Sequence, residues 1–389
     1  MSILASAWAA ACNPHSTDDG TSDADVNAGD ASVDGDPDGS VEEGRDGDAL
    51  PDAEDARGDG TSHADATDAP VVVVDAGPPP DCTALGPEGE PLALGCTGLY
   101  SSWQSQTIAP DVVAFDPGIH LWSDGAEKSR WIQLPAGQQI NTSNMNEWTF
   151  PVGTKLWKEF RLNGLKVETR LTWKKSASVW VRVAYAWSVD QSTATELRAG
   201  AKNVRGTTYE IPSAGDCSIC HNGRLDGVLG FEAIGLSTPG ATGLNMAALV
   251  AQNKLTNSPA SPLVIPGTPT DVAALGWLHA NCGTSCHSPS NYALAKDTGL
   301  FMRLDAAKLG SVPTTDTYQT AVNVPSTFQP SAGAGFFRIK PKDAAHSCIP
   351  YRDGIRDPNP GDHIQMPPLA THIVDTAGVG LVTSWIDSL

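Results

Sequence analysis

Cys217-Ser218-Ile219-Cys220-His221 reads C-x-x-C-H, the attachment motif of a c-type haem. In such a motif the two thiols add across the haem vinyl groups, and the adjacent histidine lies under the iron as its proximal ligand. The sequence therefore predicts a covalent haem on Cys217 and Cys220, with His221 as an axial ligand of the iron. The alternative is a disulfide or a zinc pair beside an unrelated histidine.

A second segment, residues 281–287, reads N-C-G-T-S-C-H and contains C-x3-C-H, one residue longer than the usual spacing. We expect a second haem on Cys282 and Cys286, with His287 as its proximal ligand. The extra residue requires a bulged turn, for which Gly283 supplies a permissive backbone. The alternative is a disulfide from Cys282 to Cys286 or to Cys348, with the histidine merely nearby.

The sixth ligands of the two irons are sought among methionines and histidines. Met366 lies in a Gln-Met-Pro-Pro loop ahead of a terminal helical pattern, and its prolines would stiffen the loop. We pair Met366 with the haem on His287, where a thioether ligand would raise the reduction potential. For the first haem, Met246, His279 and Met302 are candidates. His279 could equally be a helix-capping or core histidine, and a lone methionine is usually a core residue.

The remaining cysteines are explained separately. Cys82 and Cys96 flank a short loop rich in Gly and Pro and are expected to form a disulfide. Cys348 is left over, so it is either a free thiol or evidence that one of the other assignments is wrong.

The N-terminal residues indicate export. Residues 1–12, MSILASAWAAAC, resemble the end of a bacterial lipoprotein signal peptide that would be lipidated at Cys12, although a basic start is missing and Ala9 stands where Leu is usual. An irrelevant cysteine is the alternative. Residues 13–80 contain almost no large apolar side chains and are interpreted as a disordered acidic linker. We therefore expect a protein of the periplasm, or one anchored to the outer membrane or cell surface.

Charge is unevenly distributed along the chain. Residues 1–81 hold 20 acidic and 2 basic residues of a chain whose net charge is −20, so most of the acidity belongs to the linker. No basic patch or recognition motif stands out, which disfavours nucleic-acid binding. No apolar run is long enough to cross a bilayer, so membrane attachment is expected through a lipid anchor only.

Hydrophobic periodicity predicts an α+β fold. Residues 81–212 form a β-rich module, expected as an antiparallel sandwich, with strands at 112–115, 130–134, 147–150, 155–162, 165–173, 179–187 and 208–211. Glu168 and Arg170 share one face of a strand and are expected to form an ion pair. Residues 213–389 form a mainly α-helical, haem-binding module resembling cytochrome c, with helical patterns at 246–254, 271–281, 305–309 and 378–389.

Several segments together resemble a family of secreted bacterial dihaem c-type cytochromes. They are LWSDGAEK at 121–128, RWIQLP at 130–135, WTFPVGT at 148–154, VETRL at 167–171, the first haem motif, LGF at 229–231, WLHANC at 277–282 and QMPPL at 365–369. The resemblance covers residues 97–389, and the segments occur in the same order. It implies a β-rich module followed by a haem-bearing module. In this family the second motif is usually C-x2-C-H, so the C-x3-C-H spacing departs from the pattern.

The sequence thus predicts an exported c-type cytochrome that transfers electrons through one or two covalently attached haems. Its expected partner is a periplasmic dehydrogenase or a terminal oxidant. One alternative is a dihaem peroxidase or oxidase, which needs a five-coordinate haem. Another is a surface lipoprotein without haem, whose β-rich module binds a partner and whose cysteines form disulfides.

Overall fold

The computed structural model describes residues 79–330, 333–357 and 364–389. These residues belong to one compact unit. The predicted lipidation site Cys12 and nearly all of the predicted linker lie outside them. No helix among the described residues is long and apolar enough to cross a membrane.

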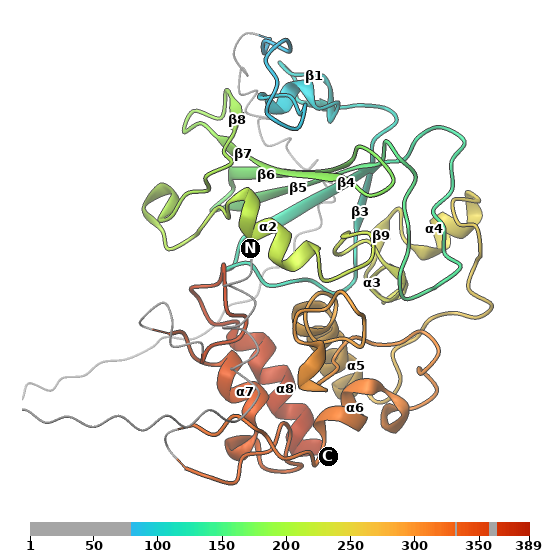
Figure 1. Ribbon diagram of the computed structural model, residues 1–389, viewed down its shortest axis with the longest axis vertical. Coiled ribbons are helices and arrows are strands. Elements are labelled where there is room, and N and C mark those ends of the chain that lie inside the picture. The colour runs from blue at the N-terminus through green and yellow to red at the C-terminus, as the bar shows by residue number, and fades with distance from the viewer. Residues whose placement is uncertain (1–78, 331–332, 358–363) are drawn as a thin grey trace, which may run out of the picture. The chain divides into compact units, whose positions relative to one another are not determined.

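The predicted α+β class is confirmed, and its centre is one seven-stranded antiparallel sheet (Figure 1). The strands follow the order β8-β7-β6-β5-β4-β3-β9, and a separate two-stranded ribbon pairs β1 with β2. Their bounds are β1 Tyr100–Ser102, β2 Thr107–Ile108, β3 Val113–Asp116, β4 Glu127–Gln133, β5 Lys155–Leu162, β6 Leu165–Lys174, β7 Trp180–Trp187, β8 Ala194–Glu196 and β9 Thr242–Gly243. Beside the ribbon there is one large sheet, not the two facing sheets of the predicted sandwich, because the second face of this sheet is covered by helices and loops.

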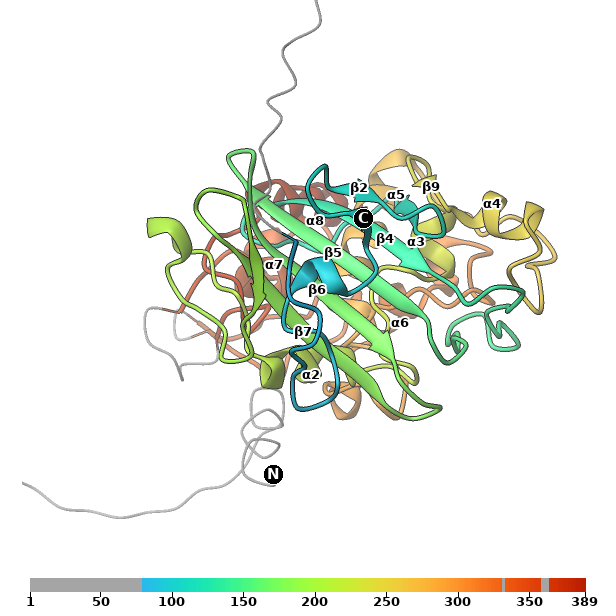
Figure 2. The same ribbon diagram turned by 90° about the horizontal axis from the view of Figure 1, so that it is seen from above.

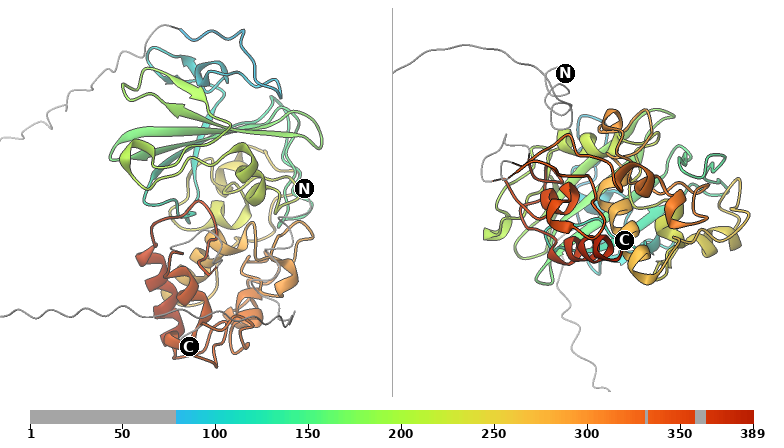
Figure 3. Two further views of the ribbon diagram at one scale, coloured as in Figure 1. Left: turned by 60° about the vertical axis from the view of Figure 1, so that its left-hand side comes forward. Right: turned by 90° about the horizontal axis from the view of Figure 1, so that it is seen from below.

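The two faces of the sheet have different partners, because successive side chains in a strand point to opposite sides. On one face Trp157, Leu171 and Val183 are cross-strand neighbours on β5, β6 and β7. They pack with Leu94 and Trp103 of the N-terminal segment, which crosses this face in Figure 2. On the other face, side chains of β4 and β5 join the largest core with the helical part, which lies beneath the sheet in the left view of Figure 3.

Short helices and turns make up most of the rest of the chain. The α-helices are α2 Ala214–His221, α3 Ala233–Ser237, α4 Met246–Ala251, α5 Pro269–Leu278, α6 Asp316–Ala321, α7 Cys348–Asp353 and α8 Thr376–Ser388. A π-helical turn, η3 His279–Gly283, continues α5, and short 3₁₀ turns are η1 Leu94–Cys96, η2 Val204–Gly206, η4 Lys296–Thr298, η5 Val312–Thr314 and η6 Ala344–His346. Helices α5 and α8 contact each other, and Trp385 Nε1 donates to the Asp271 carboxylate over 2.8 Å.

Three predicted elements are wrong. Residues 147–150 and 208–211 form only isolated bridges, Asn141 with Thr149 and Ala201 with Ile211. The backbone of Phe150 donates to the Asp226 carboxylate over 2.6 Å instead of to a neighbouring strand. Residues 305–309 form turns, in which the Asp305 carboxylate accepts from the backbone of Ala307 and competes with helix formation.

The β-rich and helical parts share one core. Strand β9, from the part predicted to be helical, pairs with β3 through Phe115 and Gly243. Phe231 and Ile234 pack in the same buried cluster as Ile132 of β4. The predicted boundary at residue 212 therefore separates two styles of secondary structure within a common interior.

Candidate functional site

The first motif lies on α2, directly beneath the sheet (Figure 1). Ser213 caps this helix in a reciprocal capping box with Asp216. Helical spacing then brings Cys217, Cys220 and His221 to neighbouring positions, because residues three and four apart lie on one side of a helix. Both cysteines are free thiols. The geometry is suited to attaching a planar group along this side of α2.

His221 is in the protonation state that a metal ligand needs. Its Nδ1 lies 2.5 Å from the backbone carbonyl of Gly227 and donates to it. The ring proton is thereby held at Nδ1, and Nε2 keeps its lone pair, as in metal-bound histidines. Burial, together with the positive charge of Arg182, lowers the pKa of His221 to about 3. The imidazole is therefore neutral throughout the physiological pH range.

The second motif begins in the π-helical turn η3, which absorbs the extra residue of C-x3-C-H. The backbone N–H of Thr284 donates to the His279 carbonyl and that of His287 to the Cys282 carbonyl, both over 2.9 Å and both five residues apart. Such one-residue insertions into a helix are frequent at functional sites. The expected bulge is therefore confirmed as a π-helical turn.

Gly283 has a different role from the one predicted. It is absent from the residues with positive φ, so the turn does not need its conformational freedom. A Cβ at this position would lie 2.3 Å from the backbone nitrogen of Arg303 and 2.4 Å from the carbonyl carbon of Met302. Gly283 is required because another segment of backbone passes directly against it.

The described cysteines form one disulfide, and the cysteines of both motifs are free. The predicted disulfide between Cys82 and Cys96 is present, with a Cα–Cα distance of 5.4 Å. Cys282 and Cys286 are free thiols, so the alternative disulfides of the second motif are absent from the described structure. Cys348 is buried at the start of α7 and lines the same cavity as these two cysteines.

Each motif borders its own cavity. The first cavity is bordered by Cys217, Cys220 and His221 and contains about 1400 Å³ of atom-free space, part of it open solvent. The second is bordered by Cys282, Cys286 and His287 and contains about 1180 Å³ on the same measure.

The second cavity has an apolar lining with two thioethers. Leu294, Leu300, Phe328 and Ile349 contribute to its walls, and Met302 and Met366 also border it. Burial lowers the pKa of His287 to about 4, against an opposing effect of the Leu300 backbone. The predicted pairing of Met366 with His287 is therefore compatible with the structure, because both residues border one cavity.

The first cavity lies between the sheet and the second motif. The loop after β3 contributes Leu121 and Trp122, which belong to the segment LWSDGAEK. The loop 367–371 borders it from another side, and Pro367 and Pro368 border the second cavity as well. Asn281 and Cys286 also border both cavities, so the two spaces share a wall.

The two motifs contact each other through their backbones. A Cβ on Gly223, two residues after His221, would lie 1.9 Å from the carbonyl oxygen of Ser285. Burial raises the pKa of Cys220 to about 12, and the nearby thiol of Cys286 adds to this shift. Groups attached at the two motifs would therefore lie close together.

His279 borders the first cavity but is in the wrong tautomer for a metal ligand. Its Nδ1 accepts from the backbone N–H of Leu304 over 2.9 Å, so a neutral ring carries its proton at Nε2. Nε2 lies 3.4 Å from a carboxylate oxygen of Glu232. The proposal that His279 ligates the first iron therefore finds no support in its hydrogen bonding.

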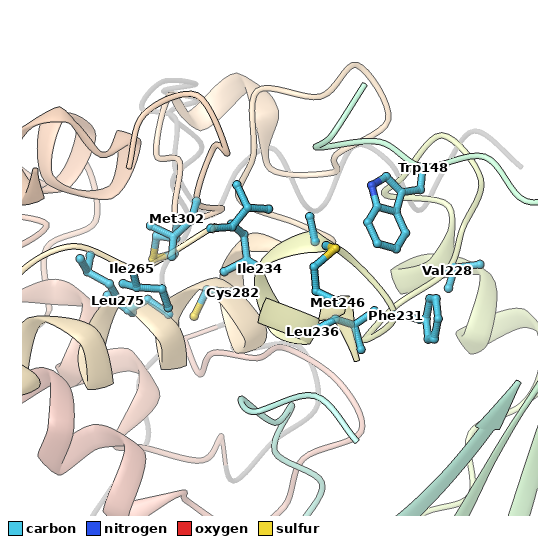
Figure 4. Close-up of a cluster of buried hydrophobic side chains, with 14 of the residues drawn as sticks. Trp148, Val228, Phe231, Ile234, Leu236, Met246, Ile265, Leu275, Cys282 and Met302 are labelled. Carbon is cyan, nitrogen blue, oxygen red and sulfur yellow. The ribbon is translucent and has the colours of Figure 1, made fainter. Parts of the chain in front are cut away.

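The methionine candidates for the first iron lie elsewhere. Met302 borders the second cavity, and its backbone donates to the His287 carbonyl over 2.8 Å. Met246 is buried in the hydrophobic core near Phe231 and Leu236 and borders neither cavity (Figure 4). Among the described residues that line the first cavity there is no methionine, and His279 is the one histidine besides His221.

Sequence reasoning missed three cationic residues of the first cavity, namely Arg130, Lys158 and Arg170. They occupy polar positions in alternating strands, which normally indicates a solvent-facing side chain. Only the pairing of β4, β5 and β6 brings them together. The predicted ion pair of Glu168 with Arg170 is confirmed, with contacts of 2.8 and 2.6 Å.

A metal site made of protein ligands alone is not found among the described residues. No group of three or more His, Cys, Asp or Glu side chains that could hold a metal ion occurs in the parts of the chain that the structure describes. A haem c site differs from a metal site made of protein ligands alone, because the protein supplies only two thiols and one or two axial ligands. The two motifs fit that smaller requirement.

No family model, curated protein or solved structure matches the chain. The resemblance to secreted dihaem cytochromes therefore stays a hypothesis, to be argued from the geometry of the two motifs and their cavities.

Proposed function

We propose that this protein is an exported c-type cytochrome that carries two covalently attached haems and transfers electrons. The observation that carries the proposal is that each cysteine–histidine motif borders its own cavity. Free thiols face both cavities, and burial keeps both proximal histidines neutral. When bound, a haem supplies the one-electron chemistry, and the protein controls its potential through ligands and burial.

The shared wall between the cavities favours electron transfer from one site to the other. Gly223 and Ser285 are in backbone contact, and Cys286 borders both cavities. Asn281 of η3 and the prolines Pro367 and Pro368 border both cavities as well. By this proposal, a periplasmic dehydrogenase or terminal oxidant exchanges electrons with the pair, and lipidated Cys12 anchors the protein to a membrane.

The test is a count of haem per chain, on full-length protein made in a host that matures c-type cytochromes. The pyridine haemochrome assay is expected to give two haems for the parent chain. The double variants C217A/C220A and C282A/C286A are each expected to retain one. The matched control C348A is expected to retain two, because Cys348 belongs to neither motif. A colourless parent protein would refute the proposal and favour a surface lipoprotein without haem.

A second candidate function is a dihaem peroxidase or oxidase, which the composition of the first cavity favours. A haem there would have His221 on one side and neither a methionine nor a suitably protonated histidine among the described lining residues. If a haem bound there had no second ligand from the protein, a small molecule such as peroxide could bind its iron.

Carbon monoxide binding tests this second candidate. The reduced protein is expected to bind about one carbon monoxide per chain, because only the first site lacks a thioether at its cavity. The C217A/C220A variant is expected to lose that binding, and C282A/C286A to retain it. Peroxide turnover no faster than that of free haem would rule out the peroxidase.

A further inference from the structure

One row of positive charge crosses the sheet at the first cavity. Arg130 on β4 lies directly opposite Lys158 on β5, and Lys158 lies directly opposite Arg170 on β6. All three side chains border the first cavity. We call these three residues the cationic row.

Such a row is unfavourable without counter-ions, because like charges on directly opposite residues destabilise a sheet. Two of its members have a carboxylate partner within the protein. Arg130 pairs with Asp116, and Arg170 forms a two-pronged contact with Glu168. The side chain of Lys158, in the centre, makes no hydrogen bond or ion pair within the described residues. Burial, together with the positive charges of Arg130 and Arg170, lowers the pKa of Lys158 well below the usual value of a lysine.

The other carboxylates of the first cavity are engaged elsewhere. Glu210 contacts His372 Nε2 over 3.0 Å. Asp216 belongs to the capping box of α2, and Glu232 caps α3 by accepting from backbone N–H groups. None of these three carboxylates makes an ion pair with Lys158, so the described protein leaves one cation of the row without a counter-anion.

Lys158 also lies close to the first motif. It borders a smaller cavity together with His221 and Leu229, in addition to the first cavity itself. An anion held by the cationic row would therefore lie beside the group attached at the first motif.

We propose that the cationic row is a carboxylate-binding site whose occupant is the propionate groups of the first haem. The inference rests on the proposed function. Haem carries two propionates, and charge-assisted contacts from Arg and Lys are the strongest that such groups form. A free carboxylate from solution is the other source of the same chemistry, and the experiment separates the two.

The test compares K158M, K158R and K202M in the full-length, haem-loaded protein. Lys202 is exposed and borders neither cavity, so K202M controls for loss of charge alone. All variants are expected to keep two haems, because the thioether bonds remain. K158M is expected to lower the reduced-to-oxidised ratio of the first haem about tenfold at fixed potential, equivalent to about 59 mV for one electron. K158R and K202M are expected to stay within about threefold of the parent.

Acetate titration identifies the source of the anion. If the propionates fill the site, acetate leaves the potential of the loaded protein unchanged, while it stabilises C217A/C220A saturably and does not stabilise C217A/C220A/K158M. If acetate instead shifts the loaded parent saturably, a free carboxylate is the occupant and the assignment to propionates is overturned.

The inference can fail independently of the proposed function. A parent protein with two haems whose potential is unchanged by K158M would overturn the role of the row while leaving the cytochrome intact. A protein without haem would refute the cytochrome, yet the acetate titration would still decide whether the row binds a carboxylate. In that protein, a K158M variant more stable than the parent would show that Lys158 lacks a counter-anion. If acetate failed to stabilise the protein, the proposed carboxylate-binding site would be overturned.

Discussion

Replacing Met366 with alanine is expected to lower the reduction potential of the second haem by a few tenths of a volt, within the range of about 0.8 V that axial ligands span. Met366 borders the cavity of His287, Cys282 and Cys286. A thioether ligand stabilises the reduced iron, and its loss leaves water or a weaker ligand in its place. The haem count is expected to stay at two, since no cysteine is changed.

Redox titration followed in the visible spectrum measures this effect. The far-red absorption band of a ferric haem with a methionine ligand is expected to disappear in M366A. The matched control is M302L, because Met302 is the other thioether at the second cavity. If M302L removes the band and M366A retains it, the assignment of the sixth ligand is reversed. If neither variant changes the band or the potential, neither Met366 nor Met302 is the sixth ligand, and a parent protein without the band would mean that the second iron has no thioether ligand.

The motifs and the cavities differ in how far sequence could predict them. C-x-x-C-H is a local pattern, and its spacing suffices to place Cys217, Cys220 and His221 on one side of a helix. The C-x3-C-H pattern required a bulge, and the π-helical turn at η3 provides it. The wall that the two cavities share could not be predicted from the sequence, because Gly223 and Ser285 meet only through the tertiary fold.

The sixth ligands show the same limit. Met366, His279 and Met302 were chosen by residue type and by place in the chain. Their surroundings in the fold distinguish these residues as ligand candidates. Met302 lies at the second cavity, and His279 accepts a hydrogen bond at Nδ1. A tautomer depends on which backbone N–H or carbonyl faces the ring, and no sequence pattern encodes that contact.

The sheet was predicted well at its centre and poorly at its edges. Strands β5, β6 and β7 alternate apolar and polar residues over 8 to 10 positions, and they occur close to the predicted bounds. Strands β1, β2, β8 and β9 have only two or three residues each, too short for periodicity to show. The sandwich was wrong for a related reason. An apolar strand face is compatible equally with a second sheet and with helices, and residues 213–389 supply the helices.

The polar positions of the central strands also hid a functional signal. Lys158 lies between Trp157 and Glu159 in β5, and a lysine at such a position is normally solvated. Pairing to Arg130 and Arg170 turns it into part of a cavity wall. Charged residues that are ordinary in one strand become unusual when three adjacent strands place them in one row.

Replacing Gly223 with alanine is expected to destabilise the protein by at least about 3 kcal/mol, at the upper end of the usual cost of overpacking. The added Cβ would lie 1.9 Å from the Ser285 carbonyl oxygen and 2.8 Å from its carbonyl carbon. Backbone cannot rotate away as a flexible side chain can, so α2 and the second motif must separate. Urea unfolding followed by circular dichroism, with the haem-loaded parent as reference, measures the loss.

The matched control for Gly223 is G310A, since a Cβ at Gly310 meets nothing within 4 Å and this residue lacks a positive φ. G310A is expected to change stability by no more than about 0.5 kcal/mol, as is usual for surface substitutions. G223A should also slow electron exchange between the two haems, because it moves the motifs apart. A G223A protein as stable as G310A would mean that the two motifs are not in backbone contact. The proposed haems would then not be held close together by this contact.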